Sequence, residues 1–215
     1  EEPGCVTVSA DVGLVAPSVQ PALRGRLVWT LTDDGVLSLS LRLRRTLGFP
    51  SLPRLGLRLF LPESMSQVDY YGLGPQESYV DKRRASHHGA FSADVVDLHE
   101  DYIRPQENGS HADCNKVIVT GGGLSLAVVG PTPFSFNASR YTQEELAARH
   151  RNTDLTPSGS TVLCLDAAMA GIGSNSCGPA LRPRYQVDSQ ELGMELHLLL
   201  NPLISHTSTH NEVTL

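Results

Sequence analysis

The sequence predicts an all-β fold, a large antiparallel β-sandwich accompanied by one short helix. Two observations carry this prediction. Several segments alternate apolar and polar side chains, most clearly VLSLSLRLRR (36–45), and a period of two places successive side chains on opposite faces of a strand. Tight-turn sequences also separate neighbouring segments, as in TDDG (32–35). A chain of 215 residues is long enough to bury one sizeable core.

The first three expected strands follow one another along the chain. RGRLVWTL (24–31) precedes the turn at 32–35, which has a glycine at a position that tolerates positive φ. After 36–45, the segment RLGLRLFL (54–61) places four leucines on one face. Prolines limit this segment on both sides, at Pro50, Pro53 and Pro62. We expect these three segments to be successive antiparallel strands of one large sheet.

Further alternating or apolar segments predict five more strands. Three glycines, Gly121 to Gly123, form a turn between the first two of them. The five expected strands are 116–120, 124–129, 161–166, 183–188 and 194–200. Together the strands predict a single domain over residues 1–200, and 201–215, where the alternation ends, is expected to be a loosely ordered tail.

One helix is expected near 142–151. Thr142-Gln-Glu-Glu145 has the spacing of a capping box, in which the threonine hydroxyl accepts a first-turn N–H and the glutamate reaches back to the cap. The helix should end near Asn152. Because so short a helix is marginal alone, it must dock on the sheet.

Composition narrows the possible partners. The formal net charge is -6, so we expect no nucleic-acid partner, and no segment approaches the roughly 20 apolar residues that span a bilayer. The start, EEPGCVTVSA, does not have the pattern of a signal peptide. The four cysteines match no zinc-site spacing, and free thiols indicate a reducing, cytoplasmic compartment. Two sequons, at Asn108 and Asn137, would matter only in a secreted protein.

A search for catalytic or metal-binding patterns gives one weak candidate. No GxSxG elbow is present, and GLGPQE lacks the helix start that a phosphate loop needs. Acidic residues and histidines cluster near His87-His88, and on a strand three of them would share a face that could bind a cation. That cluster comprises Asp94, Asp97, His99, Glu100 and Asp101. A solvated acidic loop is the favoured interpretation, so no metal site is predicted.

Four rigid segments carry polar side chains: YYGLGPQESY (70–79), YIRPQENG (102–109), FNASRYT (136–142) and GIGSNSCGP (171–179). Buried polar groups of this kind must be paired, because each unpaired one costs about 1–3 kcal/mol. From the residues alone, two interpretations stay open. The segments either lock the edge of a sheet or line a sugar-type pocket.

In their order and approximate spacing, the four segments resemble the C-terminal domain of bacterial-type β-galactosidases of glycoside hydrolase family two. That family carries G-L-G-P-Q-E-x-Y, a tyrosine-led segment ending in E-N-G, F-x-x-S-R-Y-[ST] before a short helix, and G-[IV]-G. The matching framework positions here are Gly72, Gly74, Pro75, Gln76, Glu77, Tyr79, Arg104, Glu107, Asn108, Gly109, Ser139, Arg140 and Tyr141. The resemblance is firm from about residue 54 to 200.

The resemblance implies a supersandwich, also seen in galactose mutarotases, that is one piece of a larger enzyme acting on terminal β-galactosides such as lactose. It implies that both catalytic glutamates and the magnesium site lie upstream in a (β/α)₈ barrel, so this chain has no catalytic residue and no cofactor. The parent's magnesium and sodium would be held mainly by other domains. The partners implied are the remaining domains of the same polypeptide and, in a homo-oligomer, further copies. The domain here is expected to be truncated at its N-terminus, which would expose a sheet edge.

Two expectations concern single residues. Glu77 and Glu107 are expected to belong to a hydrogen-bonding framework, with Gln76 pairing buried groups and Tyr71 and Tyr79 packed beside it. The substrate-proximal loop is expected at Ser174, Asn175, Ser176 and Cys177, where Cys177 stands at the position of a sugar-stacking tryptophan in the best-known family members. A thiol has no flat apolar face, so the leaving-group subsite should differ; the alternative is a small buried apolar residue.

A stand-alone sugar-binding or mutarotase-like module is the alternative function. Such an epimerase needs an acid and a base near the sugar ring. The histidines available are His87, His88, His99 and His111.

Overall fold

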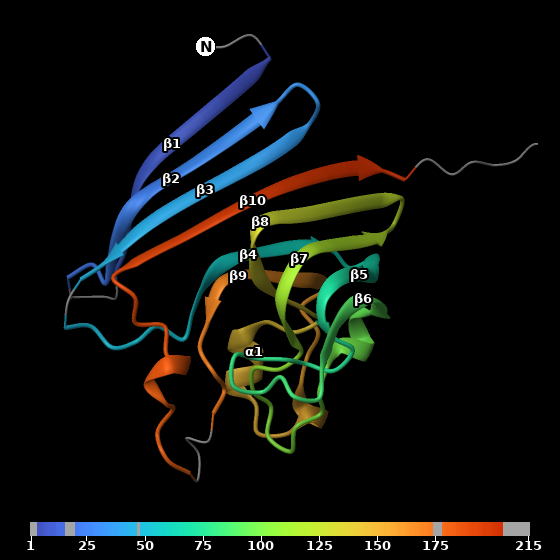
Figure 1. Ribbon diagram of the computed structural model, residues 1–215. Coiled ribbons are helices and arrows are strands. Elements are labelled where there is room, and N and C mark those ends of the chain that lie inside the picture. Colours follow the sequence, from blue (N-terminus) through green and yellow to red (C-terminus); the bar gives the residue numbers. More distant parts are fainter. Residues whose placement is uncertain (1–3, 16–19, 47, 174–177, 204–215) are drawn as a thin grey trace, which may run out of the picture.

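The computed structural model describes residues 4–15, 20–46, 48–173 and 178–203. Within them the chain forms ten strands whose pairings are all antiparallel, so the all-β prediction is confirmed (Figure 1). The strands are β1 (Cys5–Leu14), β2 (Leu23–Thr32), β3 (Val36–Arg45), β4 (Arg54–Pro62), β5 (Met65–Gly74), β6 (His87–Asp94), β7 (Ser110–Gly121), β8 (Leu124–Ser139), β9 (Ser160–Met169) and β10 (Glu191–Pro202).

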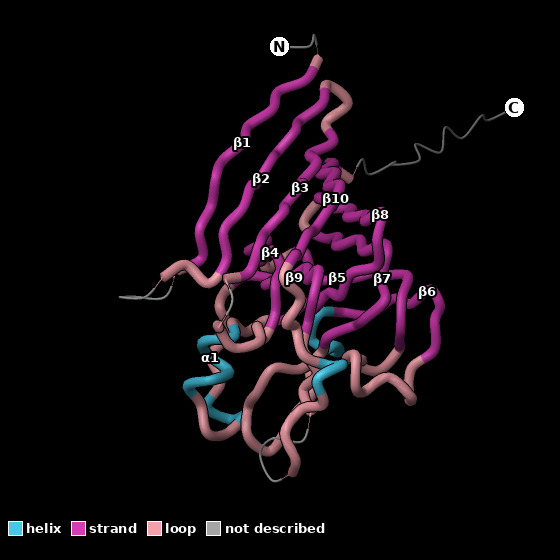
Figure 2. Tube along the Cα trace, turned by 60° about the vertical axis from the view of Figure 1, so that its left-hand side comes forward, coloured by secondary structure: helices cyan, strands magenta, loops and turns pink. Residues whose placement is uncertain are grey.

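The longest strand, β8, connects the two layers of the sandwich. Its first part pairs with β10 and β7, in the order β1-β2-β3-β10-β8-β7-β5-β6, and β7 continues to pair with its last part. Its second half, Ser135–Ser139, pairs with β9, which in turn pairs with β4. Figures 1 and 2 show β4 and β9 lying across the longer layer. The two layers enclose one large core.

That core is built by the alternation seen in the sequence. On one face of β3, Leu39 lies opposite Leu196 of β10. Two positions along, Leu41 of β3 lies opposite Met194 of β10. On the facing layer, Leu163 and Leu165 of β9 are fully buried. Burial of one such side chain contributes about 1.5–3 kcal/mol, so the core is the main source of stability.

Seven of the eight expected strands are confirmed, and one is wrong. The segment 183–188 contains a 3₁₀ helix, Pro183–Tyr185 (η3), and only Val187 makes an isolated bridge, with Leu52. Proline has no N–H for a strand ladder and suits the first turn of a helix instead. The alternation in the sequence also does not reveal β1, β5 and β6.

The three strands expected first along the chain belong to one antiparallel sheet, but they are not three successive neighbours in it. β2 and β3 are neighbours, but β4 pairs with β9 and not with β3. The connection from Arg45 to Arg54 contains Pro50 and Pro53, and it carries the chain from one layer to the other. Strand β10, from the far end of the chain, takes the place beside β3.

The expected helix is present but shorter, as α1 (Gln143–Ala148). The Thr142 hydroxyl accepts the Glu145 N–H at 3.1 Å, as predicted. The carboxylate of Glu145 does not reach back to the cap; it binds the Arg149 guanidinium at 2.7 Å and the Thr156 N–H at 2.9 Å. Buried Leu146 docks the helix on the rest of the molecule.

The last described strand, β10, runs to Pro202. Residues 204–215 lie outside the described residues. The expected boundary at residue 200 between the domain and a loosely ordered tail therefore stays a prediction.

The structure describes three of the four cysteines. Cys5, Cys114 and Cys164 are free. No helix in the described part of the chain is long and apolar enough to cross a membrane.

Candidate functional site

Glu77 is the centre of a buried polar cluster just after β5. Its side chain accepts hydrogen bonds from the Lys82 ammonium, the Tyr102 hydroxyl and, at 2.8 Å, the backbone N–H of Gly109. The Lys82 ammonium also donates to the Tyr102 hydroxyl at 2.8 Å. Glu77 is only 5% exposed. This residue of the first rigid segment therefore holds both ends of the second segment, 102–109.

The electrostatics of the cluster follow from these contacts. Partial burial would lower the pKa of Lys82, but its hydrogen bonds to Glu77 and Tyr102 outweigh this and raise it. Burial, followed by the hydrogen bond to Glu77, raises the pKa of Tyr102. Hydrogen bonds to an ionised acceptor are among the stronger ones in proteins, so a carboxylate with three donors is suited to joining loops.

The end of the second segment, Asn108-Gly109, is fixed by hydrogen bonds between side-chain amides and backbone groups. The Asn108 amide oxygen accepts the Glu100 N–H at 3.0 Å, and the Asn137 amide donates to the Asn108 carbonyl. Gly109 has φ +70°, and a Cβ there would lie 2.3 Å from the Leu98 carbonyl oxygen. Only glycine fits this position without moving the backbone.

Glu107 belongs to a second cluster, centred on Arg54. The guanidinium donates to Asp166 through Nε at 2.9 Å and to Glu107 through a terminal nitrogen at 3.0 Å. Burial raises the pKa of both carboxyl groups, and the Arg54 charge opposes that rise. Glu77 and Glu107 therefore have separate cationic partners, Lys82 and Arg54. Neither Arg54 nor Asp166 was expected from the sequence to take part in a site.

The third rigid segment is held at the start of α1. Arg140 donates to the Glu63 carbonyl at 2.6 Å and to the Thr161 hydroxyl at 3.0 Å. The Ser139 hydroxyl accepts the Tyr141 N–H at 3.0 Å. These contacts join the segment to the turn between β4 and β5 and to β9.

The fourth segment is anchored by Asp81, which the sequence analysis also missed. The Asp81 carboxylate accepts the N–H groups of Ile172 at 3.2 Å and Gly173 at 2.8 Å. The expected substrate-proximal residues Ser174, Asn175, Ser176 and Cys177 follow directly, and they lie outside the described residues. Asp81 thus fixes the backbone of the two residues that directly precede them.

A groove of about 620 Å³ lies beside this anchor. Arg54 and Glu107 line it together with Ile172 and Leu181. The volume is within the roughly 300–1,000 Å³ usual for small-molecule sites. The groove therefore brings the Arg54 cluster and Ile172, which Asp81 holds, to one surface.

Other expected positions lie apart from this groove. Tyr79 is buried, whereas Gln76, Tyr71 and Arg104 are exposed. The exposure of Gln76 and Tyr71 gives no support to the expectation that Gln76 pairs buried groups and that Tyr71 packs beside it, which stays a prediction. Pro75 is exposed as well, while Gly72 and Gly74 are buried in β5.

The acidic cluster does not form the strand that a shared face would require. Asp97 lies in a 3₁₀ helix, Val95–Leu98 (η1). The Nε2 atom of His99 lies 3.5 Å from a carboxylate oxygen of Asp101, and the His99 ring packs near the Tyr141 ring. Among the residues that the structure describes, no three His, Cys, Asp or Glu side chains are placed to hold a metal ion. This part of the chain thus offers no such cluster to the magnesium that the resemblance implies for the parent.

His111 is not available as an acid or base. It is 1% exposed and stacks on Phe136 with ring centroids 5.1 Å apart. Burial lowers its pKa to about 4, and its Nδ1 lies 3.1 Å from the Leu73 carbonyl oxygen. His87 and His88 are exposed at the start of β6.

Comparison with known proteins identifies the relatives of this chain. The β-galactosidase of Actinobacillus pleuropneumoniae is 39% identical over 186 residues, which are 84% of this chain and 18% of that protein. The β-galactosidase of Staphylococcus xylosus is 37% identical over 193 residues, 90% of this chain and 19% of that protein. The chain thus spans less than a fifth of the length of these curated relatives.

A solved structure of an aldose 1-epimerase-like protein from Escherichia coli K12 aligns with 94% of this chain and 67% of its own, at 11% identity and a TM-score of 0.46. The family model described as β-galactosidase small chain matches residues 2–200. With that match over most of its length, the chain belongs to the β-galactosidase small-chain family.

Proposed function

We propose that this chain is a non-catalytic domain of a retaining β-galactosidase and that it shapes one wall of the active site for galactosides such as lactose. The observation that carries the proposal is the Asp81 anchor, which fixes Ile172 and Gly173, directly before residues 174–177 in the sequence, beside a groove. The names of the family and of its relatives support the proposed substrate class.

Catalysis is assigned to other parts of the parent. Retaining hydrolysis needs two carboxyl groups about 5–5.5 Å apart, one as acid/base and one as nucleophile. Glu77 and Glu107 are bound to Lys82 and Arg54 respectively, so each is committed to a structural contact. We place the catalytic glutamates and the parent's magnesium and sodium in the remaining domains.

The Asp81 anchor gives a direct test in the complete enzyme. Asp81→Asn keeps the shape of the side chain but weakens its hold on two N–H groups, so KM for lactose should rise several-fold. Asp97→Asn is the matched control, because Asp97 is exposed in η1, and it should leave KM unchanged. An unaltered KM in Asp81→Asn, with the protein folded, would contradict the wall proposal.

Cys177→Trp tests the expected substrate-proximal position. The added aromatic face should change the affinity for lactose relative to that for an aryl galactoside. Equal effects on both substrates would remove the subsite from the proposal.

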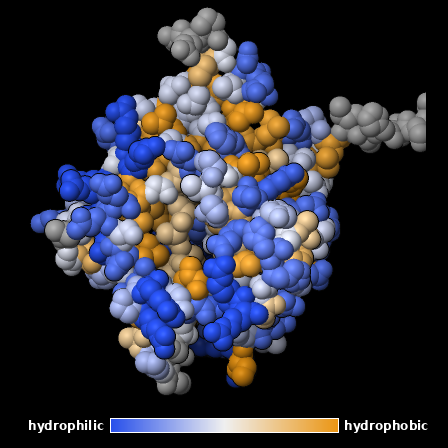
Figure 3. All heavy atoms as spheres, viewed as in Figure 1, coloured by the Kyte–Doolittle hydropathy of each residue, from blue (hydrophilic) through white to orange (hydrophobic). Residues whose placement is uncertain are grey.

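Contacts with the remaining domains or with further copies are proposed for the outer strands. Val6 and Val8 of β1 are 63% and 61% exposed, and Leu31 of β2 is 46% exposed. Figure 3 shows apolar side chains among polar ones on the part of the surface where these strands lie. Apolar surface of this kind marks interaction sites. Truncating Val8 to Ala in the complete enzyme should weaken its assembly, measured by sedimentation.

A cytoplasmic location is also proposed. Its support is the free state of Cys5, Cys114 and Cys164 in the described part of the chain, because unpaired thiols are typical of reducing compartments. Fractionation of cells that produce the complete enzyme would test it.

A further inference from the structure

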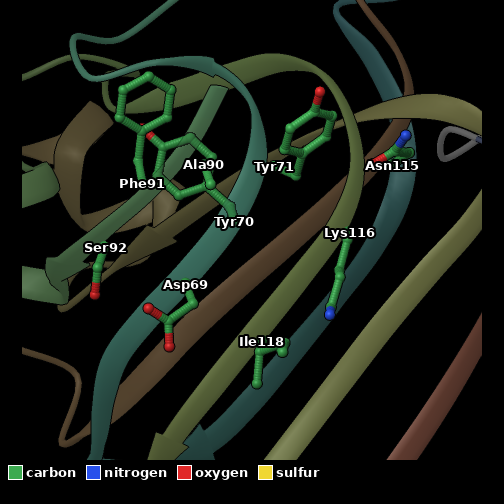
Figure 4. Close-up of a pocket in the computed structure, with 9 residues that line it drawn as sticks. All are labelled: Asp69, Tyr70, Tyr71, Ala90, Phe91, Ser92, Asn115, Lys116 and Ile118. Carbon is green, nitrogen blue, oxygen red and sulfur yellow. The ribbon is translucent and has the colours of Figure 1, made fainter. Parts of the chain in front are cut away.

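A second groove, of about 610 Å³, lies on the outer face of β5, β6 and β7. Its apolar surface includes Tyr71, Ala90 and Ile118 (Figure 4). It shares no lining residue with the groove beside the Asp81 anchor. Its size is within the roughly 300–1,000 Å³ range of small-molecule sites.

Strand register sets which side chains meet in this groove. Residues two apart on a strand share a face, and directly opposite residues on neighbouring strands are adjacent. The three strands therefore bring two rows of side chains to the groove, Ala90-Tyr71-Lys116 and Ser92-Asp69-Ile118. The rows are about 7 Å apart along the strands, so an aromatic ring and a carboxylate lie within the span of one small ligand.

Tyr71 is held in place although it is 44% exposed. Its ring packs edge-to-face on His88, with centroids 4.7 Å apart and planes at 80°. The Nε2 atom of His88 lies 3.1 Å from the Asp113 carbonyl oxygen, which ties the imidazole to the sheet. Because the Tyr71 ring is already held in place, it loses little conformational entropy when a ligand packs on it.

Polar groups without partners surround the apolar surface. Within the described residues, Asp69, Ser92 and Lys116 have no side-chain hydrogen bond or ion pair. The groove has one acidic side chain, Asp69, and one basic side chain, Lys116, so it favours neither an anionic nor a cationic ligand. A purely apolar ligand would exclude water from these polar groups without offering them hydrogen-bond partners, which would cost binding free energy.

We propose that this groove binds a neutral saccharide, with an apolar sugar face on Tyr71 and hydroxyl groups hydrogen-bonded by Asp69, Ser92 and Lys116. A sugar ring combines an apolar C–H face with donors and acceptors at its edge, which is the combination the groove offers. The inference stands on this groove alone and goes beyond the proposed function.

Titration of the 215-residue chain with lactose, followed by amide NMR shifts, tests the proposal. Saturable millimolar binding is expected, with shifts concentrated at Tyr71, Ala90 and Ile118. Tyr71→Ala should weaken binding about tenfold, whereas Tyr71→Phe should keep it. Phe60→Ala, which removes another exposed aromatic ring, is the matched control and should have no effect.

Three results would overturn the proposal. They are the absence of saturable shifts in the unaltered chain, equal weakening by Phe60→Ala, and equally tight binding of cyclohexanol, which has the apolar ring without the hydroxyl pattern. Asp69→Asn provides a second variant if Tyr71→Ala does not fold, and it should weaken binding while leaving the far-ultraviolet spectrum unchanged. None of these results bears on the Asp81 wall, which is tested by KM in the complete enzyme.

Discussion

Replacing Glu77 with glutamine should destabilise the chain, because Glu77 joins three donors in one buried cluster. Glutamine has nearly the same shape, but it has one acceptor oxygen and turns an NH₂ group towards donors. The Gly109 N–H is buried and has no access to water as a substitute partner. Lys82, whose side chain is 50% exposed, can turn towards solvent.

The size of the decrease in the free energy of unfolding follows from these differences between glutamate and glutamine. Hydrogen bonds to charged groups contribute about 1.5–3 kcal/mol each, while the half-exposed Lys82 pair adds little because water screens it. The loss of one such bond in Glu77→Gln therefore predicts a decrease of about 2 kcal/mol in the free energy of unfolding. For a chain of this size, that lowers Tm by about 4–8 °C.

Urea unfolding monitored by circular dichroism measures this decrease. Glu191→Gln, at an exposed site in β10, is the control and should stay within about 0.5 kcal/mol of the unaltered chain. If Glu77→Gln were no less stable than this control, Glu77 would not hold the loops together and the framework interpretation would be refuted.

Three further predictions concern buried groups. Gly109→Ala should cost clearly more stability than Gly123→Ala, since both have positive φ but only at Gly109 would the Cβ meet a carbonyl oxygen; equal losses in urea unfolding would argue against the clash. His111 has a folded pKa of about 4 and an unfolded value near 6.5, so stability should fall by up to about 1.4 kcal/mol per pH unit as the pH drops between them. His111→Asn should remove that slope, and an unchanged slope would show that other groups cause it. Arg54→Met should cost about 3–5 kcal/mol at neutral pH by leaving the buried carboxylate of Asp166 and the partly buried carboxylate of Glu107 without their cationic partner. Since burial raises their pKa, the loss should shrink as the pH is lowered, and a loss that grows instead would contradict this account.

Strands with strong alternation can be predicted from the sequence, and those with weak alternation cannot. The leucines of β3 all lie on the less exposed face, so this strand shows its period by itself. Strand β6, HHGAFSAD, contains few residues that favour strands, and its pairing with β5 is what forms it. In β5, Gly72 and Gly74 obscure the pattern, because glycine is depleted in strands.

The candidate site is predictable only in part. Glu77 and Asn108 can be singled out because each lies in a rigid, polar segment. The partner of Ile172 cannot, since Asp81 lies 91 positions away and nothing local marks it. Arg54 likewise reads as one polar residue of an alternating strand, and only the fold brings it to Asp166.

Turnover of a chromogenic β-galactoside tests the central claim most directly. The 215-residue chain alone should show no hydrolysis, because Glu77 and Glu107 are bound to Lys82, Arg54 and a backbone group, while the complete enzyme that contains it should be active. Hydrolysis by the isolated chain that Glu77→Gln abolishes would contradict the account, since it would make the framework carboxylate a catalytic one.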